Sequence, residues 1–99
     1  MSLDGFSIPS GHPVFDGHFP DYPVVPGSMV LDWVLALWGK PYHSLARVKF
    51  HRPLEPDIWV GVAFEPLSGG AVEFVCRGDT GTVCSGRIEP LPVGDLLLP

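Results

Sequence analysis

The pattern of apolar and polar residues divides the chain into a proline-rich start, a continuous apolar segment and a series of short alternating segments. The start, residues 1–26, contains five prolines, which exclude a helix and disfavour central strands. Only Leu3–Ile8 has a pattern that permits a short strand. Because proline also restricts the unfolded chain, such a loop loses little entropy on folding and is suited to holding side chains in place.

Residues 27–38 are predicted to form a helix. A proline precedes this segment, Gly39 follows it, and Ser28 is a candidate N-cap. The last ten residues of the segment are apolar with one exception, Asp32. A helix without a polar face is normally buried on all sides, so we expect the rest of the chain to surround it.

The remainder of the chain predicts strands, because short apolar and β-branched segments alternate with glycine and proline turns. The segments are Ala46–Phe50, Ile58–Phe64, Ala71–Arg77 and Thr82–Ile88. We expect an antiparallel meander over about residues 45–89, with a fifth strand from the N-terminal segment. One buried helix and about five strands make an α+β fold, and 99 residues predict a single domain, 1–99.

Charge and composition exclude several classes of protein. The net charge is −5 with six basic residues, which argues against a nucleic-acid-binding protein. No apolar run approaches the roughly 20 residues of a membrane span, and the start lacks the basic and apolar regions of a secretory signal. We therefore expect a cytoplasmic protein without a membrane span.

Cysteine and histidine spacing does not predict a metal site or a bound cofactor. The two cysteines, Cys76 and Cys84, are too few for a zinc cage or a disulfide scaffold. Their separation allows a disulfide across a hairpin, although two free buried thiols are the favoured alternative.

Three residues are candidates for chemistry. Asp32 is the only ionisable residue in the apolar helix, and burial there would favour its protonated form, unless the helix reaches the surface at this point. His18 lies in the proline-fixed loop, where a histidine is otherwise structural or solvated. Gly27 begins the helix, where free amides and the positive end of the helix dipole suit a developing negative charge. A glycine there also simply relieves the turn.

Taken together, these residues form a specific pattern. The segment from His18 to Asp32 contains His-Phe-Pro, two further prolines, Pro-Gly, and an acid 14 positions after the histidine. It strongly resembles the signature of the β-hydroxyacyl-acyl carrier protein dehydratases. The segment Arg47–Asp57 is similar to a strand and turn of the same family, and the resemblance covers roughly Ser10 to Glu89.

The resemblance implies a hotdog fold, in which a curved antiparallel sheet wraps a central helix. It also implies a homodimer with composite sites and loss of water from a 3-hydroxyacyl thioester, giving a trans-2-enoyl thioester in fatty-acid, polyketide or related lipid synthesis. His18 would be the base, Gly27 would hold the thioester oxygen, and Asp32 would protonate or orient the departing hydroxyl. Apolar neighbours would line the acyl tunnel or belong to the core: Phe19, Val25, Met29, Val30 and Trp33.

An acyl carrier protein is acidic, so a chain with net negative charge needs a local basic patch to bind it. Four of the six basic residues fall close together and are either this patch or a solvated strand edge: Lys40, Arg47, Lys49 and Arg52. Two other functions remain open. One is a hotdog thioesterase, which does not require the histidine loop, and the other is a non-catalytic acyl-binding module.

Two departures from the family pattern affect the site. Family members usually carry a further segment before the histidine loop, which bears on substrate length and on closure of the pocket. Asp32 stands where many plain dehydratases have glutamate. The branch of the family that also isomerises the double bond has aspartate there.

Overall fold

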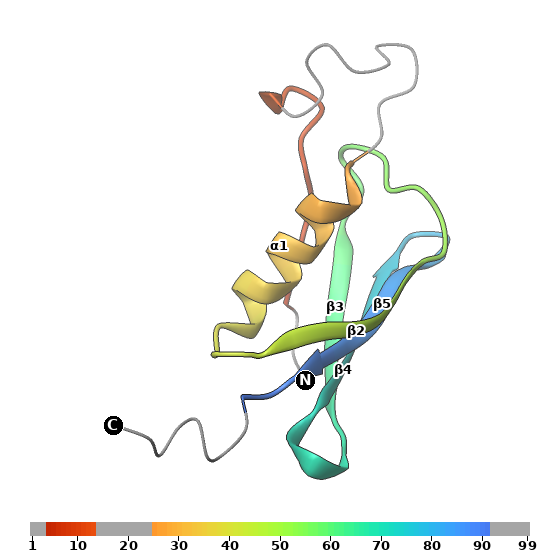
Figure 1. Ribbon diagram of the computed structural model, residues 1–99. Coiled ribbons are helices and arrows are strands. Elements are labelled where there is room, and N and C mark those ends of the chain that lie inside the picture. The colour runs from red at the N-terminus through yellow and green to blue at the C-terminus, as the bar shows by residue number, and fades with distance from the viewer. Residues whose placement is uncertain (1–3, 14–24, 92–99) are drawn as a thin grey trace.

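The computed structural model describes residues 4–13 and 25–91 and contains one helix packed against one antiparallel sheet (Figure 1). Helix α1 spans Gly27–Trp38, as the sequence predicts. The strands are β1 (Gly5–Phe6), β2 (Ser44–Phe50), β3 (Val60–Pro66), β4 (Val72–Gly78) and β5 (Gly81–Glu89), with a short 3₁₀ turn, η2 (Ser68–Gly70), before β4. This architecture confirms the predicted α+β class and the hotdog arrangement of sheet and helix.

The order of strands in the sheet is β1-β3-β4-β5-β2, so the predicted meander over all four later strands is wrong. Only β3, β4 and β5 follow one another, because short glycine turns close their hairpins. The connection from β2 to β3, residues 51–59, is longer and contains two prolines. It carries the chain across the sheet, so that β2 pairs with β5 from Ser44↔Glu89 to Phe50↔Cys84.

Strand β2 is therefore the edge of the sheet, and its pairing with β5 is interrupted by a bulge between Ala46 and Lys49. The bulge inserts one residue opposite β5, and Arg47 in it has a left-handed φ of 55°. The bulge turns the Arg47 side chain away from the core, and the residue is exposed.

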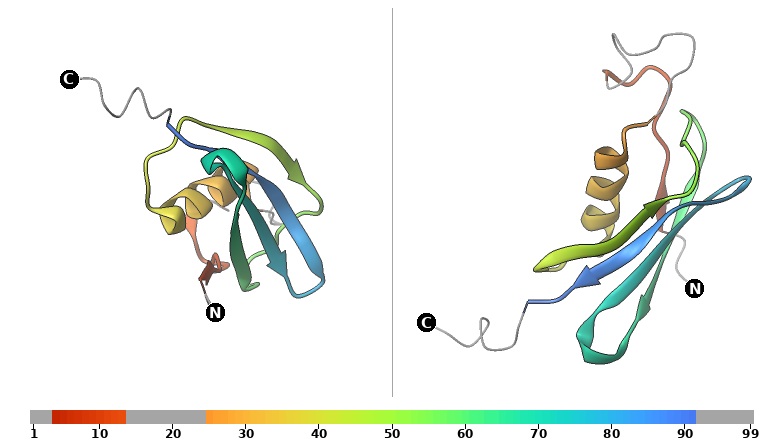
Figure 2. Two further views of the ribbon diagram at one scale, coloured as in Figure 1. Left: turned by 90° about the horizontal axis from the view of Figure 1, so that it is seen from below. Right: turned by 45° about the vertical axis from the view of Figure 1, so that its right-hand side comes forward.

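The core lies between α1 and the concave face of the sheet (Figure 2). Val30 and Val34 of the helix are 1% and 0% exposed, and Phe74 of β4 is 0% exposed. Residues at alternate positions of β3, β4 and β5 complete this core, as the two-residue period of a strand requires. The sequence pattern thus identifies the buried face of each strand.

The described part of the chain does not surround the helix, contrary to expectation. The sheet covers one side of α1, and on the other side Ser28, Asp32, Trp33 and Ala36 are exposed (Figure 2). Trp33 is 39% exposed, and its inner face stacks on Phe6 with a centroid distance of 5.6 Å. Within the described residues, a single chain is too small to enclose an apolar helix on all sides.

The helix begins and ends through backbone interactions. Pro26, and not the predicted Ser28, is the N-cap, and its carbonyl accepts the first helical hydrogen bonds, from the amides of Met29 and Val30. Gly39 ends the helix with a left-handed φ of 68° and donates its N–H to Leu35 O. In the part of the chain that the structure describes, no helix is long and apolar enough to cross a membrane.

Cys76 and Cys84 are directly opposite each other on β4 and β5, both fully buried. Both are free thiols, which agrees with the favoured alternative. A hydrogen bond with Cys84, together with burial, raises the pKa of the Cys76 thiol above its ordinary value. This thiol therefore stays protonated, and the pair belongs to the core.

Gly86 of β5 provides a test of this packing. A Cβ on Gly86 would lie 2.7 Å from Cζ of Phe74 and 3.1 Å from Cγ2 of Val48. Because Phe74 is fully buried, its ring has no space into which to move. We expect Gly86→Ala to lower the free energy of unfolding by about 1–3 kcal/mol, measured from urea unfolding curves.

Gly61 of β3 is the matched control, because a Cβ there meets no atom within 4 Å. Gly61→Ala is expected to change the free energy of unfolding by less than about 0.5 kcal/mol. Equal stability of the two variants would contradict the described packing of Phe74 against β5.

Candidate functional site

A cavity of about 530 Å³ lies at the N-terminal end of α1. Its size falls within the range of roughly 300–1,000 Å³ typical of small-molecule sites. The wall is mostly apolar and comes from the helix entry, the end of β2, the loop after it and β5. The lining residues are Val25, Gly27, Val30, Phe50, His51, Arg52, Pro53, Leu54 and Val83.

Two backbone hydrogen bonds hold this wall together. The amide of Val25 donates to Leu54 O at 2.8 Å, which fastens the helix entry to the loop after β2. The amide of His51 donates to Val83 O at 2.7 Å, which fastens the same loop to β5. The cavity is therefore built on backbone pairing between segments far apart in the sequence.

Gly27 is the first residue of α1 and one wall of the cavity. The amides of Gly27 and Ser28 precede the first donors of the helix and have no acceptor within it. The positive end of the helix dipole lies at the same place. The sequence predicts that this helix start holds an oxygen that gains negative charge during the reaction. Its position beside the cavity agrees with this prediction.

Two polar side chains at the rim are held by neighbours. The Nε2 atom of His51 lies 3.0 Å from Oγ of Ser85. Arg52 donates from Nη1 to the carbonyl of Thr80 at 2.8 Å and to its Oγ1 at 3.1 Å. These contacts tie the loop after β2 to β5 and to the turn before it.

Two of the predicted site residues, the base His18 and its neighbour Phe19, lie outside the described residues. Asp32 is on α1 but does not line the cavity, and it is exposed, which is the alternative in which the helix reaches the surface at this point. It lies five positions after Gly27, which on a helix is a rotation of about 140°. One chain thus presents Gly27 to the cavity and Asp32 away from it.

The predicted acyl-lining residues divide in the same way. Val25 and Val30 line the cavity and are 4% and 1% exposed. Met29 packs against the core cluster, and Trp33 stacks on Phe6. Met29 therefore follows the core alternative, whereas Trp33 belongs neither to the cavity wall nor to the core cluster.

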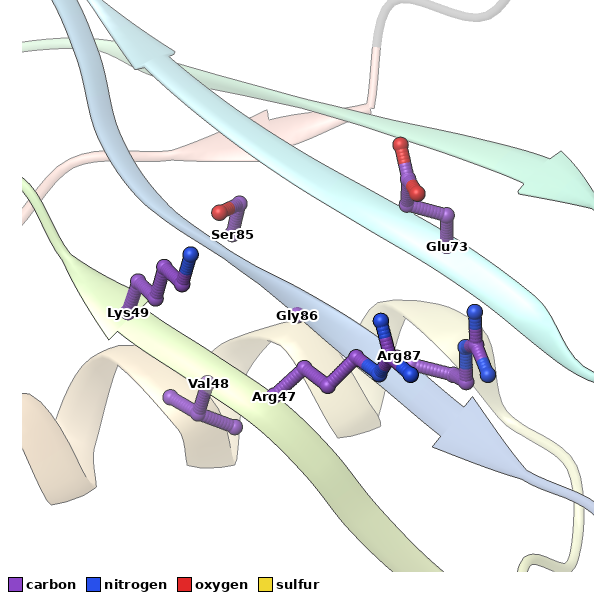
Figure 3. A pocket seen from close by; sticks show the side chains of 7 residues that line it. All are labelled: Arg47, Val48, Lys49, Glu73, Ser85, Gly86 and Arg87. Atoms are coloured by element: carbon purple, nitrogen blue, oxygen red, sulfur yellow. The ribbon is translucent and has the colours of Figure 1, made fainter.

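The four basic residues predicted as a patch do not lie together. Arg47 and Lys49 line a groove of about 420 Å³ on the face of the sheet away from α1, with Arg87 of β5 (Figure 3). Lys40 lies over the Trp38 ring, 4.9 Å from its centroid, and Arg52 is bound to Thr80. The groove thus keeps two of the four predicted cations and adds Arg87.

Sequence reasoning missed the part of the wall that comes from Phe50 and Leu54. Both belong to the segment that matches the family's strand and turn, so the signal was present. Their role was hidden because only the fold brings this segment against the helix start.

Comparisons with known proteins agree with this architecture. The family model of the ApeI-like dehydratases, described as ApeI dehydratase, matches residues 4–87. A 3-hydroxyacyl-[acyl-carrier-protein] dehydratase FabZ from Psychromonas ingrahamii is 31% identical over 101 residues, covering 83% of this chain and 67% of that protein. The dehydratase heterocomplex ApeI:P from Xenorhabdus doucetiae superposes with a TM-score of 0.73 at 25% identity, covering 86% of this chain and 81% of that one. The chain belongs to the ApeI-like dehydratase family.

Proposed function

We propose that this protein removes water from a 3-hydroxyacyl thioester carried on an acyl carrier protein, in fatty-acid or related lipid synthesis. The observation that supports this proposal most is the apolar cavity beside the free amides of the helix start. The chain that carries this cavity belongs to a dehydratase family. Family membership argues against the thioesterase. The lining by Gly27 argues against a binding module without chemistry.

The reaction needs a base, an oxygen site and an acid. The imidazole of His18 takes the C2 proton, because its basicity suits neutral pH. The electron pair moves toward the thioester oxygen, which accepts a hydrogen bond from the amide of Gly27. The electron pair then returns to form the C2–C3 double bond as the C3–O bond breaks, and Asp32 gives its proton to the departing hydroxyl, which leaves as water. The products are a trans-2-enoyl thioester and water. His18 then releases the C2 proton to solvent and Asp32 takes one up, which restores both groups.

We also propose that two copies of the chain form a dimer with composite sites. Asp32 does not line the cavity of its own chain, and residues 4–13 and 25–91 leave the helix face that carries it uncovered. A second subunit on this face brings its own helix start to Asp32. Strand β2 has a free edge in the single chain, where a second sheet can add.

An acidic acyl carrier fits the groove on the outer face of the sheet. Arg47 and Lys49 have no acidic partner among the described residues, while Arg87 has only Glu89 at 3.9 Å. The groove is also lined by one acid, Glu73, so its lining residues carry two more positive than negative charges in a chain of net charge −5. Charge complementarity of this kind speeds encounter with an acidic partner and fixes its orientation.

Substitution of the two catalytic side chains tests the reaction. We expect His18→Ala and Asp32→Asn each to reduce hydration of crotonyl-pantetheine by about 10²–10⁴-fold, because each removes a proton-transfer group. The loss of enoyl absorbance measures the rate. His43→Ala and Glu65→Gln are matched controls at exposed positions and should keep wild-type rates. An active wild type with equally active His18 and Asp32 variants would contradict the proposed roles.

A mixed dimer tests the composite site. His18→Ala and Asp32→Asn chains with different affinity tags are expressed together, and the dimer that carries both tags is purified. One of its two sites then has both residues, so we expect about half the wild-type activity from two inactive parents. A mixed dimer as inactive as its parents would place both residues of a site in one chain. If no mixed dimer forms, the chain does not pair with itself.

Charge reversal tests carrier binding. We expect Arg47→Glu and Lys49→Glu to raise KM for a carrier-bound substrate by about tenfold, with little change for the pantetheine thioester. Arg77→Glu makes the same change of charge elsewhere in the sheet, on β4, and is the control. Equal losses on both substrates would show that these residues act on folding or on the site itself, not on the carrier.

A further inference from the structure

The side chain of Phe50 is placed in a way that core packing does not explain. Phe50 is the last residue of β2 and pairs with the buried Cys84, so its side chain points to the helix side of the sheet. It is nevertheless 51% exposed, so its burial contributes much less than that of a core phenylalanine. The contacts of the ring with neighbouring residues are therefore more informative about its role than its burial.

The ring touches the helix start. A Cβ on Gly27 would lie 2.7 Å from Cζ of Phe50, 3.0 Å from Cε1 and 3.2 Å from Cε2. These three atoms form the far edge of the ring, so the ring reaches over the first residue of α1. Gly27 has no side chain there, and this absence is what permits the approach.

The same ring is a wall of the 530 Å³ cavity. Three other residues of the wall, Val25, Val30 and Leu54, are 4% exposed or less and belong to the core. Phe50 is thus the large apolar residue of the wall that is not buried in the core. An acyl chain whose carbonyl oxygen reaches the Gly27 amide would therefore lie beside this ring.

We propose that Phe50 is the residue that determines acyl specificity, by limiting the space beside Gly27 and excluding water from its amide. This inference rests on the proposed function, because it takes the Gly27 amide as the site of the thioester oxygen. Its physical basis is that an apolar pocket discriminates chain size through the contacts of individual methylene groups. Removal of water also strengthens a hydrogen bond to the developing charge.

The test compares decanoyl and butyryl chains on wild type, Phe50→Leu, Phe50→Ala and Tyr42→Ala. Turnover is followed with the two enoyl-pantetheines, and binding is measured by calorimetry with the saturated acyl-pantetheines, which cannot react. We expect Phe50→Ala to raise the decanoyl-to-butyryl ratio of kcat/KM by about tenfold or more, with Phe50→Leu between it and wild type. Tyr42 is an aromatic residue of similar exposure, 40%, outside the cavity wall, and its variant should keep the wild-type ratio.

A ratio in Phe50→Ala within about twofold of the wild-type ratio would overturn the proposal, since the space beside Gly27 would then not select the chain. Equal losses for both chain lengths would also overturn it, because they indicate a structural role. A wild type that binds acyl-pantetheines but does not hydrate enoyl chains would instead refute the proposed reaction. In that case the binding ratio of Phe50→Ala still decides on the role of the ring. A wild type that neither binds nor reacts would refute both.

Discussion

Helix α1 has more apolar surface than the sheet of one chain can cover, and the arrangement of the molecule depends on this mismatch. Val30 and Val34 are buried against the sheet, whereas Trp33 remains 39% exposed on the other side. Full burial of a large apolar side chain is worth about 1.5–3 kcal/mol, which a small domain needs. The uncovered face therefore favours association. Asp32 lies on this face, which the described residues leave open, so the proposed second subunit would cover the apolar face and the proposed acid together.

The edge strand β2 carries a feature that restricts which strands can pair with it. A long regular edge strand pairs with any other exposed strand, and bulges and charges at the edge restrict this. In β2 the bulge at Arg47 divides the strand into two short paired parts, and a left-handed residue of this kind costs of order 1–2 kcal/mol. The same bulge turns a guanidinium to the outer face of the sheet. One irregularity thus limits pairing at the edge and supplies charge to the groove.

Local sequence patterns predicted the helix and the strands well, but they did not predict which strands lie side by side. The bounds of α1 follow from the proline and glycine at its ends, and the strand segments follow from alternation between turns. The strand order does not, because pairing of β2 with β5 depends on the path of the loop between β2 and β3. The exposure of Asp32 was missed for a related reason. An apolar helix predicts burial, but not whether its own chain or a second subunit provides it.

The candidate site shows the same division between local and distant information. The residues proposed for the chemistry, His18, Gly27 and Asp32, occur within one short segment, so a single motif contains them all. The residues that shape the cavity, such as Phe50 and Leu54, come from a different segment and reach Gly27 only through the fold. Recognition of the motif therefore identifies the reaction class, while it says little about the acyl chain. Two chains with the same motif and different residues at the end of β2 would share the proton transfers and differ in the acyl chain that the cavity accepts.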